Sequence, residues 1–145
     1  MLDLDKVVGV ILAGGQARRM GGADKPLTQI SGKPLLEYVV QRAQHQLTHL
    51  VLNANGDGER YGQFALPVQE DIVPDFAGPL AGVLSAMAWA RAFQPQATHV
   101  ITVAADTPFY PQDYVARMLA AVDERRPLAC ASYQGRTQPV FGLWP

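Results

Sequence analysis

The chain has 145 residues, a formal net charge of −1 and a hydrophobic content of 48%. This length fits one compact domain, and the near-neutral charge excludes a chain-wide basic surface for nucleic acid or a membrane. The single cysteine, Cys130, cannot form an internal disulfide or build a thiolate zinc site alone. We therefore expect a cytoplasmic protein with no nucleic-acid or membrane partner, in which Cys130 is a small buried side chain.

Apolar and polar stretches alternate along the chain. Residues 7–13 are almost wholly apolar and rich in β-branched side chains, which is typical of a strand buried on both faces. A long loop over residues 14–33 follows, and Pro34 opens a predicted helix. The remaining predicted elements, in chain order, are strands at 49–55 and 66–71, a helix at 79–93, a strand at 98–106, a helix at 110–126 and two C-terminal strands.

This alternation predicts an α/β fold with a mostly parallel central sheet. The last predicted strand, "QPVFGLW", is apolar and stands at the end of the chain. An exposed apolar strand at a sheet edge favours aggregation. We therefore expect a single domain over residues 1–145 that is truncated at its C-terminus or that covers this strand with a partner.

Polar residues follow each predicted strand. In an open α/β sheet, ligands bind beyond the carboxyl ends of the strands. The first strand is followed by the glycine-rich loop "GGQARRMGGADK", and the second ends in "NAN", which begins at Asn53. Asp71 ends the third strand and Asp106 the fourth. One edge of the sheet is therefore predicted to carry a glycine loop, amide side chains and carboxylates.

The glycine-rich loop is suited to a polyphosphate. Glycine amides can approach an anion closely, and Arg18, Arg19 and Lys25 add positive charge. The spacing matches neither the Walker pattern nor the dinucleotide-binding fingerprint. The alternatives are a flexible surface loop and, for Lys25, an ordinary solvated lysine.

Asp106 is a candidate magnesium ligand, because Mg²⁺ usually takes one or two carboxylates together with substrate phosphates. The alternative is a helix N-cap, which Pro108 and Pro111 disfavour by delaying the next helix. Asn53 and Asp71 could recognise a base or ribose, or could be turn residues. The residues alone thus predict a domain that binds a nucleoside polyphosphate with Mg²⁺.

The stretch "LAGGQARRMGGADKPL" resembles the signature of nucleotidyltransferases with a nucleotide-diphospho-sugar-transferase-like fold, and more narrowly that of the molybdenum cofactor guanylyltransferases. "VLNAN", "QEDIVPDFAGPLAG" and "AADTPF" follow in the order typical of that family, so the match spans essentially the whole chain. The resemblance implies a Rossmann-like, three-layer α/β/α fold. It also implies Mg²⁺-dependent transfer of GMP from GTP to molybdopterin, with release of pyrophosphate.

The resemblance implies roles for individual residues. The implied catalytic residues are Arg19, Lys25 and Asp106, of which Asp106 holds Mg²⁺. The implied GTP-binding residues are Leu12, Ala13, Gly14, Gly15, Lys25, Asn53, Asp71 and Asp106. The implied acceptor-binding residues are Gly78, Pro79, Leu80 and Gly82. The implied partners are GTP, molybdopterin, and molybdoenzymes or other cofactor-biosynthesis proteins, in a monomer or weak homo-oligomer.

Three alternative functions stay open. The cytidylyltransferase of the same cofactor usually shows "LAAG" where this chain has "LAGG", and the glycine at residue 14 favours guanine by letting a base approach the backbone. A sugar-phosphate nucleotidyltransferase would share the same edge but use another acceptor. Family members also carry a later stretch similar to "NxNTP" that this sequence does not show. A non-catalytic GTP-binding adaptor for molybdoenzyme maturation is therefore the alternative from another class.

Overall fold

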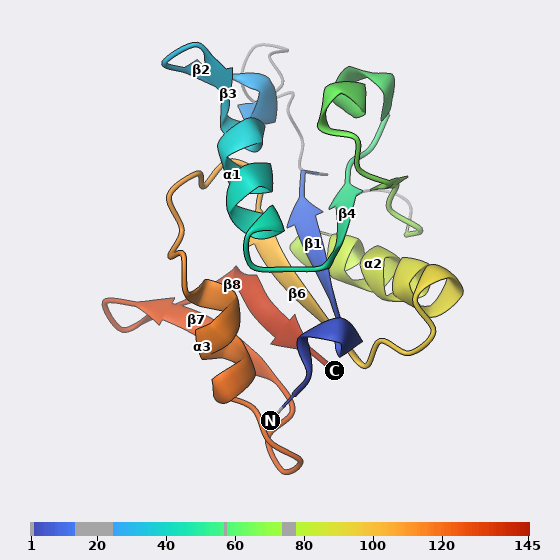
Figure 1. Ribbon diagram of the computed structural model, residues 1–145, viewed down its shortest axis with the longest axis vertical. Coiled ribbons are helices and arrows are strands. Elements are labelled where there is room, and N and C mark those ends of the chain that lie inside the picture. The colour runs from blue at the N-terminus through green and yellow to red at the C-terminus, as the bar shows by residue number, and fades with distance from the viewer. Residues whose placement is uncertain (1, 14–24, 57, 74–77) are drawn as a thin grey trace.

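The computed structural model describes residues 2–13, 25–56, 58–73 and 78–145. A six-stranded sheet with the order β5-β4-β1-β6-β8-β7 forms the middle layer of this part of the chain (Figure 1). Four strands are parallel to one another: β1 (Val7–Leu12), β4 (His49–Asn53), β5 (Val68–Gln69) and β6 (His99–Ala104). The strand β8 (Arg136–Trp144) is antiparallel both to β6 and to β7 (Ala129–Tyr133).

Helices cover both faces of the sheet. α1 (Leu35–Gln44) and α3 (Tyr114–Ala120) lie on one face, and α2 (Pro79–Phe93) lies on the other (Figure 1). The predicted α/β class with a three-layer, mostly parallel architecture is therefore confirmed.

Two hydrophobic clusters, one on each face, explain why β1 is apolar at every position. Val7 and Ile11 pack into the cluster that includes side chains of α1 and α3, whereas Val8 and Val10 pack with side chains of α2. All four are fully buried. Successive side chains of a strand point to opposite faces, so a strand covered on both faces needs an unbroken apolar run.

Two predicted elements are shorter than expected. The helix predicted at 110–126 is reduced to α3, which ends at Ala120; beyond it the chain turns, and Arg125 N–H and Arg126 N–H both donate to the carboxylate of Asp123. The strand predicted at 66–71 is only β5, which pairs with β4 at two positions.

The described part of the long loop contains structure that the sequence did not predict. A 3-10 turn at Lys25–Leu27 is followed by a small hairpin of β2 (Gln29–Ile30) and β3 (Lys33–Pro34). Its two turn residues, Ser31 and Gly32, have φ angles of 52° and 80°. Two residues with positive φ are typical of the tight turns that join antiparallel strands.

The C-terminal strand differs from the expectation of an exposed apolar edge. β8 pairs with β6 on one side and β7 on the other, and Leu143 is fully buried. On this side of the sheet the edge strand is β7, and Cys130 on it is exposed, so the expected burial of Cys130 is wrong. None of the helices in the part of the chain that the structure describes is long and apolar enough to cross a membrane.

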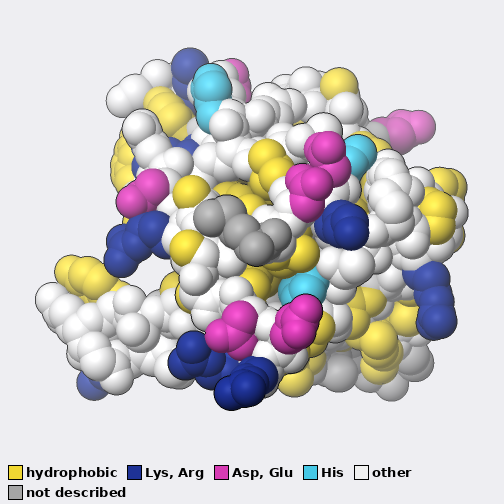
Figure 2. Space-filling view, turned by 60° about the horizontal axis from the view of Figure 1, so that its bottom comes forward, with side chains coloured by type: hydrophobic (Ala, Val, Ile, Leu, Met, Phe, Trp, Pro, Cys, Tyr) yellow, Lys and Arg dark blue, Asp and Glu magenta, His cyan; other side chains and the backbone are white. Residues whose placement is uncertain are grey.

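The end of the molecule that carries both termini has a mixed surface. Figure 2 shows Lys and Arg side chains interspersed with Asp and Glu on this face, so that it carries no large patch of a single charge. This distribution agrees with the formal net charge of −1.

Candidate functional site

The carboxyl ends of β4, β1 and β6 meet at one level of the sheet. Leu12 is in register with Asn53 on one side and with Ala104 on the other. From β1 the chain continues to β4 and β5 on one side, then crosses α2 to reach β6 on the opposite side. The strand order therefore reverses between β1 and β6, which is where open α/β sheets bind ligands.

Backbone hydrogen bonds extend the pairing just past the strand ends. The N–H of Ala13 donates to the carbonyl of Asn53 at 2.7 Å, and the N–H of Ala105 donates to the carbonyl of Leu12 at 3.1 Å. Ala13 is buried and Leu12 is partly buried. These bonds fix the two described residues that precede the glycine-rich loop.

Lys25 and Asp106 form an ion pair at this edge. Lys25 Nζ lies 2.9 Å from Asp106 Oδ2, and the two side chains are 53% and 35% exposed. Thr107 Oγ1 lies 3.4 Å from Asp106 Oδ1 and donates to it. The helix that follows, α3, begins after Asp113, so Asp106 does not cap it. The structure therefore leaves the Asp106 carboxylate just beyond the carboxyl end of β6, next to the Lys25 ammonium and partly exposed to solvent.

Asp71 is held by two amide side chains from the end of β4. Asn53 Nδ2 donates to Asp71 Oδ1 at 2.8 Å, and Asn55 Nδ2 donates to Asp71 Oδ2 at 2.9 Å. Asn53 Nδ2 also donates to the carbonyl of Gln69 at 3.2 Å. Asn53 is only 2% exposed, whereas Asp71 is partly exposed. Of Asn53 and Asp71, the Asp71 carboxylate is therefore the group that a ligand can reach, and the buried Asn53 amide holds it in place.

Ser85 ties the next residue of the same segment to α2. The N–H of Ile72 donates to Ser85 Oγ at 2.9 Å, and this hydroxyl donates to the carbonyl of Ala81 at 2.7 Å. Ser85 is fully buried. Sequence reasoning did not find this role, because a serine inside a helix gives no local signal of a distant backbone partner.

The predicted acceptor residues lie at the start of α2 and differ in exposure. Gly78, which precedes the helix, has a φ of 80° and is exposed, as is Pro79. Leu80 is 62% exposed. Gly82 is buried instead, because it faces the sheet: a Cβ there would lie 2.5 Å from Asn53 Oδ1 and 2.7 Å from Leu12 Cδ2. Gly82 thus lets the helix approach the strand ends closely.

Several predicted site residues lie outside the described part of the chain. They are Gly14, Gly15, Arg18 and Arg19. The proposed contact of Gly14 with the guanine nucleotide and the proposed roles of Gly15, Arg18 and Arg19 at the phosphates stay predictions.

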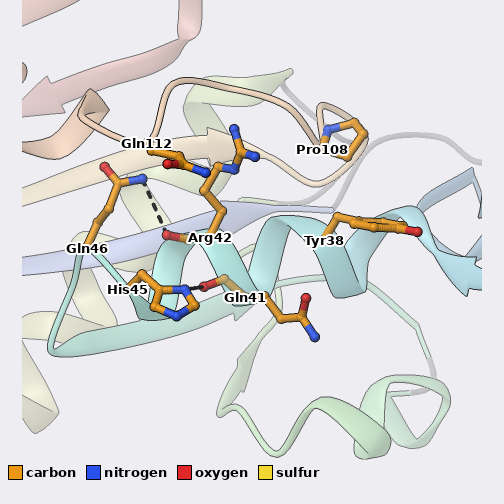
Figure 3. A pocket seen from close by; sticks show the side chains of 7 residues that line it. All are labelled: Tyr38, Gln41, Arg42, His45, Gln46, Pro108 and Gln112. Atoms are coloured by element: carbon orange, nitrogen blue, oxygen red, sulfur yellow. Dashed lines mark hydrogen bonds between the residues drawn. The ribbon is translucent and has the colours of Figure 1, made fainter.

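A hollow of about 490 Å³ lies between α1 and the segment that carries Pro108 and Gln112 (Figure 3). The residues that line it are Tyr38, Gln41, Arg42, His45, Gln46, Pro108 and Gln112. Arg42 donates to the carbonyl of Tyr110, and Gln46 Nε2 donates to the carbonyls of Arg42 and Pro111. The bonds to Tyr110 and Pro111 fasten this segment to α1 and to the turn that follows it. Burial raises the pKa of Tyr110 and the nearby Arg42 guanidinium opposes that rise, so the tyrosine hydroxyl stays neutral.

The donor set at Asp106 fits a cation that arrives with a polyphosphate. Among the residues that the structure describes, no three or more His, Cys, Asp or Glu side chains converge as ligands for a metal ion. One carboxylate at an open edge is nevertheless what Mg²⁺ uses when substrate phosphates supply the other oxygens.

The three-layer α/β/α arrangement around a six-stranded, mostly parallel sheet is that of the nucleotide-diphospho-sugar-transferase folds. The structure of molybdopterin-guanine dinucleotide biosynthesis protein A from Archaeoglobus fulgidus has this fold, with a TM-score of 0.66 and 19% identity over 95% of this chain and 66% of that one. Residues 9–145 match the family model described as a MobA-like NTP transferase domain.

Two relatives are much closer in sequence. The molybdenum cofactor guanylyltransferase of Bradyrhizobium sp. (strain ORS 278) is 52% identical over 96% of this chain, and that of Rhodopseudomonas palustris (strain BisB5) is 47% identical over 100%. The chain covers 66% and 70% of these relatives, or about two thirds of their length. The chain belongs to the MobA-like NTP transferase family, which confirms its resemblance to molybdenum cofactor guanylyltransferases and its place among nucleotidyltransferases.

Proposed function

We propose that this protein transfers GMP from GTP to molybdopterin in the cytoplasm, forming the guanine dinucleotide cofactor and pyrophosphate. The observation that carries the proposal is that Asp106, which pairs with Lys25, and the amide-held Asp71 both follow strands whose carboxyl ends are aligned along one side of the sheet. The names of the relatives that are 52% and 47% identical support the choice of reaction.

The Asp71 carboxylate is suited to a guanine base. Each carboxylate oxygen has two lone pairs, and each oxygen of Asp71 accepts one hydrogen bond from an amide of the protein. The remaining lone pairs can accept the two adjacent donors of guanine, the ring N1–H and the exocyclic amino group. Cytosine and adenine each present one donor on the equivalent edge, next to an acceptor that a carboxylate repels. This chemistry favours GTP over CTP.

Lys25 and Asp106 serve the phosphates in this proposal. A terminal phosphate oxygen of molybdopterin attacks the α-phosphorus of GTP in line, and the bond from the α-phosphorus to the oxygen that bridges to the β-phosphorus breaks. The electron pair leaves with pyrophosphate, whose charge the Lys25 ammonium stabilises by hydrogen bonds to its oxygens. Asp106 would hold Mg²⁺, which supplies further neutralisation of phosphate charge when bound.

The acceptor enters from the start of α2. Gly78, Pro79 and Leu80 are exposed there, and Gly82 beneath them brings the helix against Leu12 and Asn53. The acceptor side of the site is thereby kept next to the nucleotide side. We propose that the protein is a monomer or weak homo-oligomer. It would contact molybdoenzymes or other cofactor-biosynthesis proteins, which receive the product.

Pyrophosphate release by the full-length protein tests this proposal. The reactions contain Mg²⁺ and molybdopterin with either GTP or CTP, and a parallel series replaces molybdopterin with a sugar 1-phosphate. We expect release only with molybdopterin, and faster with GTP than with CTP. Faster release with CTP would instead support the cytidylyltransferase alternative, and GTP binding by calorimetry without turnover would support an adaptor.

A further inference from the structure

Asn55 contacts Asp71 twice and has no role in the proposal so far. Its Nδ2 donates to Asp71 Oδ2 at 2.9 Å, and its Oδ1 accepts from the backbone N–H of Asp71, also at 2.9 Å. One amide side chain therefore holds both the carboxylate and the peptide of Asp71. Asn53 binds the other carboxylate oxygen and does not share this second contact.

We infer that Asn55 is the positioning residue that sets the carboxylate plane of Asp71 for guanine, an inference that rests on the proposed function. The χ2 torsion of an aspartate is broad, so a carboxylate held at one oxygen can still rotate. Asn53 on Oδ1 and Asn55 on Oδ2 together fix the plane. A fixed plane is what two parallel donors of a base require, whereas a single donor tolerates rotation.

The backbone around Asp71 has an anchor that does not involve Asn55. Ile72 N–H donates to the fully buried hydroxyl of Ser85 on α2. Because this anchor remains when Asn55 is changed, we expect the segment to stay in place and the main loss to be the orientation of the carboxylate. The effect should therefore fall on the choice of base more than on the fold.

Calorimetry with GTP, ITP and 2′-deoxy-GTP in the presence of Mg²⁺ tests this inference. ITP lacks the exocyclic amino group of guanine, so the wild-type protein should bind GTP more tightly than ITP. We expect Asn55→Ala to weaken GTP binding by about 10-fold but ITP binding by no more than about 3-fold, so that the GTP-to-ITP affinity ratio falls. The affinity for 2′-deoxy-GTP should fall in parallel with that for GTP.

Gln69→Ala is the matched control. It removes an amide side chain from the same segment, one that donates to the carbonyl of Glu70 at 3.0 Å. All three affinities should stay within about 2-fold of the wild type, because the Asp71 carboxylate keeps both of its amide donors. Asn55→Asp has the shape of asparagine without its amide donor, so it should lower the GTP-to-ITP ratio even where Asn55→Ala fails to fold.

Two outcomes would overturn the inference. If both Asn55 variants fold and keep the wild-type GTP-to-ITP ratio, Asn55 has only a structural role. If instead the GTP-to-2′-deoxy-GTP ratio falls while the GTP-to-ITP ratio holds, Asp71 recognises the ribose. A wild-type protein that prefers CTP would refute the proposed function and this inference together, whereas failure of the inference alone leaves the GTP preference of the wild type intact.

Discussion

Replacing Gly82 with alanine tests whether the close approach of α2 to the strand ends supports the site. A Cβ at this position would lie 2.5 Å from Asn53 Oδ1 and 2.7 Å from Leu12 Cδ2. Real Cβ atoms do not approach other heavy atoms this closely, so a neighbour must move. Leu12 can turn its methyl group away. Asn53 cannot move freely, because its amide nitrogen is bonded to Asp71 Oδ1 and to the carbonyl of Gln69.

The expected cost follows from two opposing effects. Overpacking a close-packed site destabilises a protein by about 1–3 kcal/mol. Alanine is better than glycine in a helix interior by about 1 kcal/mol, which offsets part of that cost. We therefore expect Gly82→Ala to lower the free energy of unfolding by up to about 2 kcal/mol, or the thermal midpoint by up to roughly 6 °C for a chain of this size. Displacement of Asn53 should also weaken GTP binding several-fold.

Thermal and urea unfolding measure the first effect, and calorimetry with GTP measures the second. Gly62→Ala is the control, since it is the same substitution at a position where a Cβ would meet no atom within 4 Å. Its stability should stay within about 0.5 kcal/mol of the wild type. If Gly82→Ala is as stable as Gly62→Ala and binds GTP as the wild type does, the packing of α2 against Asn53 does not support the site.

Three further substitutions separate turnover from stability. Asp106→Asn should reduce Mg²⁺-dependent pyrophosphate release by about 100-fold or more without changing the thermal midpoint, and unchanged release would exclude the metal role. Lys25→Gln should raise the KM for GTP by about 10-fold in steady-state kinetics. Because the lost ion pair is exposed, the free energy of unfolding in urea should fall by less than about 1 kcal/mol. Tyr114→Phe removes a buried hydroxyl that donates to the carbonyl of Thr102 at 2.8 Å, and should cost about 1 kcal/mol in urea without altering turnover. Burial raises the pKa of Tyr114, so the unfolded state loses its proton first as the pH rises above about 10. Wild-type stability should therefore fall more steeply above that pH than the stability of Tyr114→Phe, and equal slopes would contradict this.

Local signals predicted some elements well and missed others. The helix predicted at residues 79–93 is observed as α2, Pro79–Phe93, because a glycine and proline mark its start and a proline stands soon after its end. The β2–β3 hairpin was missed because two-residue strands carry no periodicity. The last strand was expected to need further chain or a partner to cover it, whereas β8 lies between β6 and β7, and β7 occupies the edge on that side. Sequence order does not say that β8, the later of the two final strands, pairs with β6 while β7 lies outside it.

The sequence was sufficient to predict where the candidate site lies, at the carboxyl ends of the parallel strands. Parallel strands align their carboxyl ends, so Asn53, Asp71 and Asp106 were expected to converge from their positions after predicted strands. The choice of hydrogen-bond partners could not be predicted in this way. The contact between Asn55 and Asp71 depends on how the segment after β5 crosses the end of β4, and the contact between Lys25 and Asp106 depends on the path of a long loop.

The two halves of the candidate site differ in how firmly the fold holds them. On the base side, Asn53 is 2% exposed, Ser85 is fully buried, and Asp71 is bonded at both carboxylate oxygens. On the phosphate side, the Lys25–Asp106 pair is exposed by about half and a third, and screening by solvent makes such a pair weak. Selectivity requires a fixed geometry, and an exposed ion pair costs little to break when a phosphate or a cation takes the place of one partner. Substitutions that displace the buried Asn53, such as Gly82→Ala, should therefore change stability and GTP binding together, while those of Lys25 and Asp106 should change turnover and leave the fold intact.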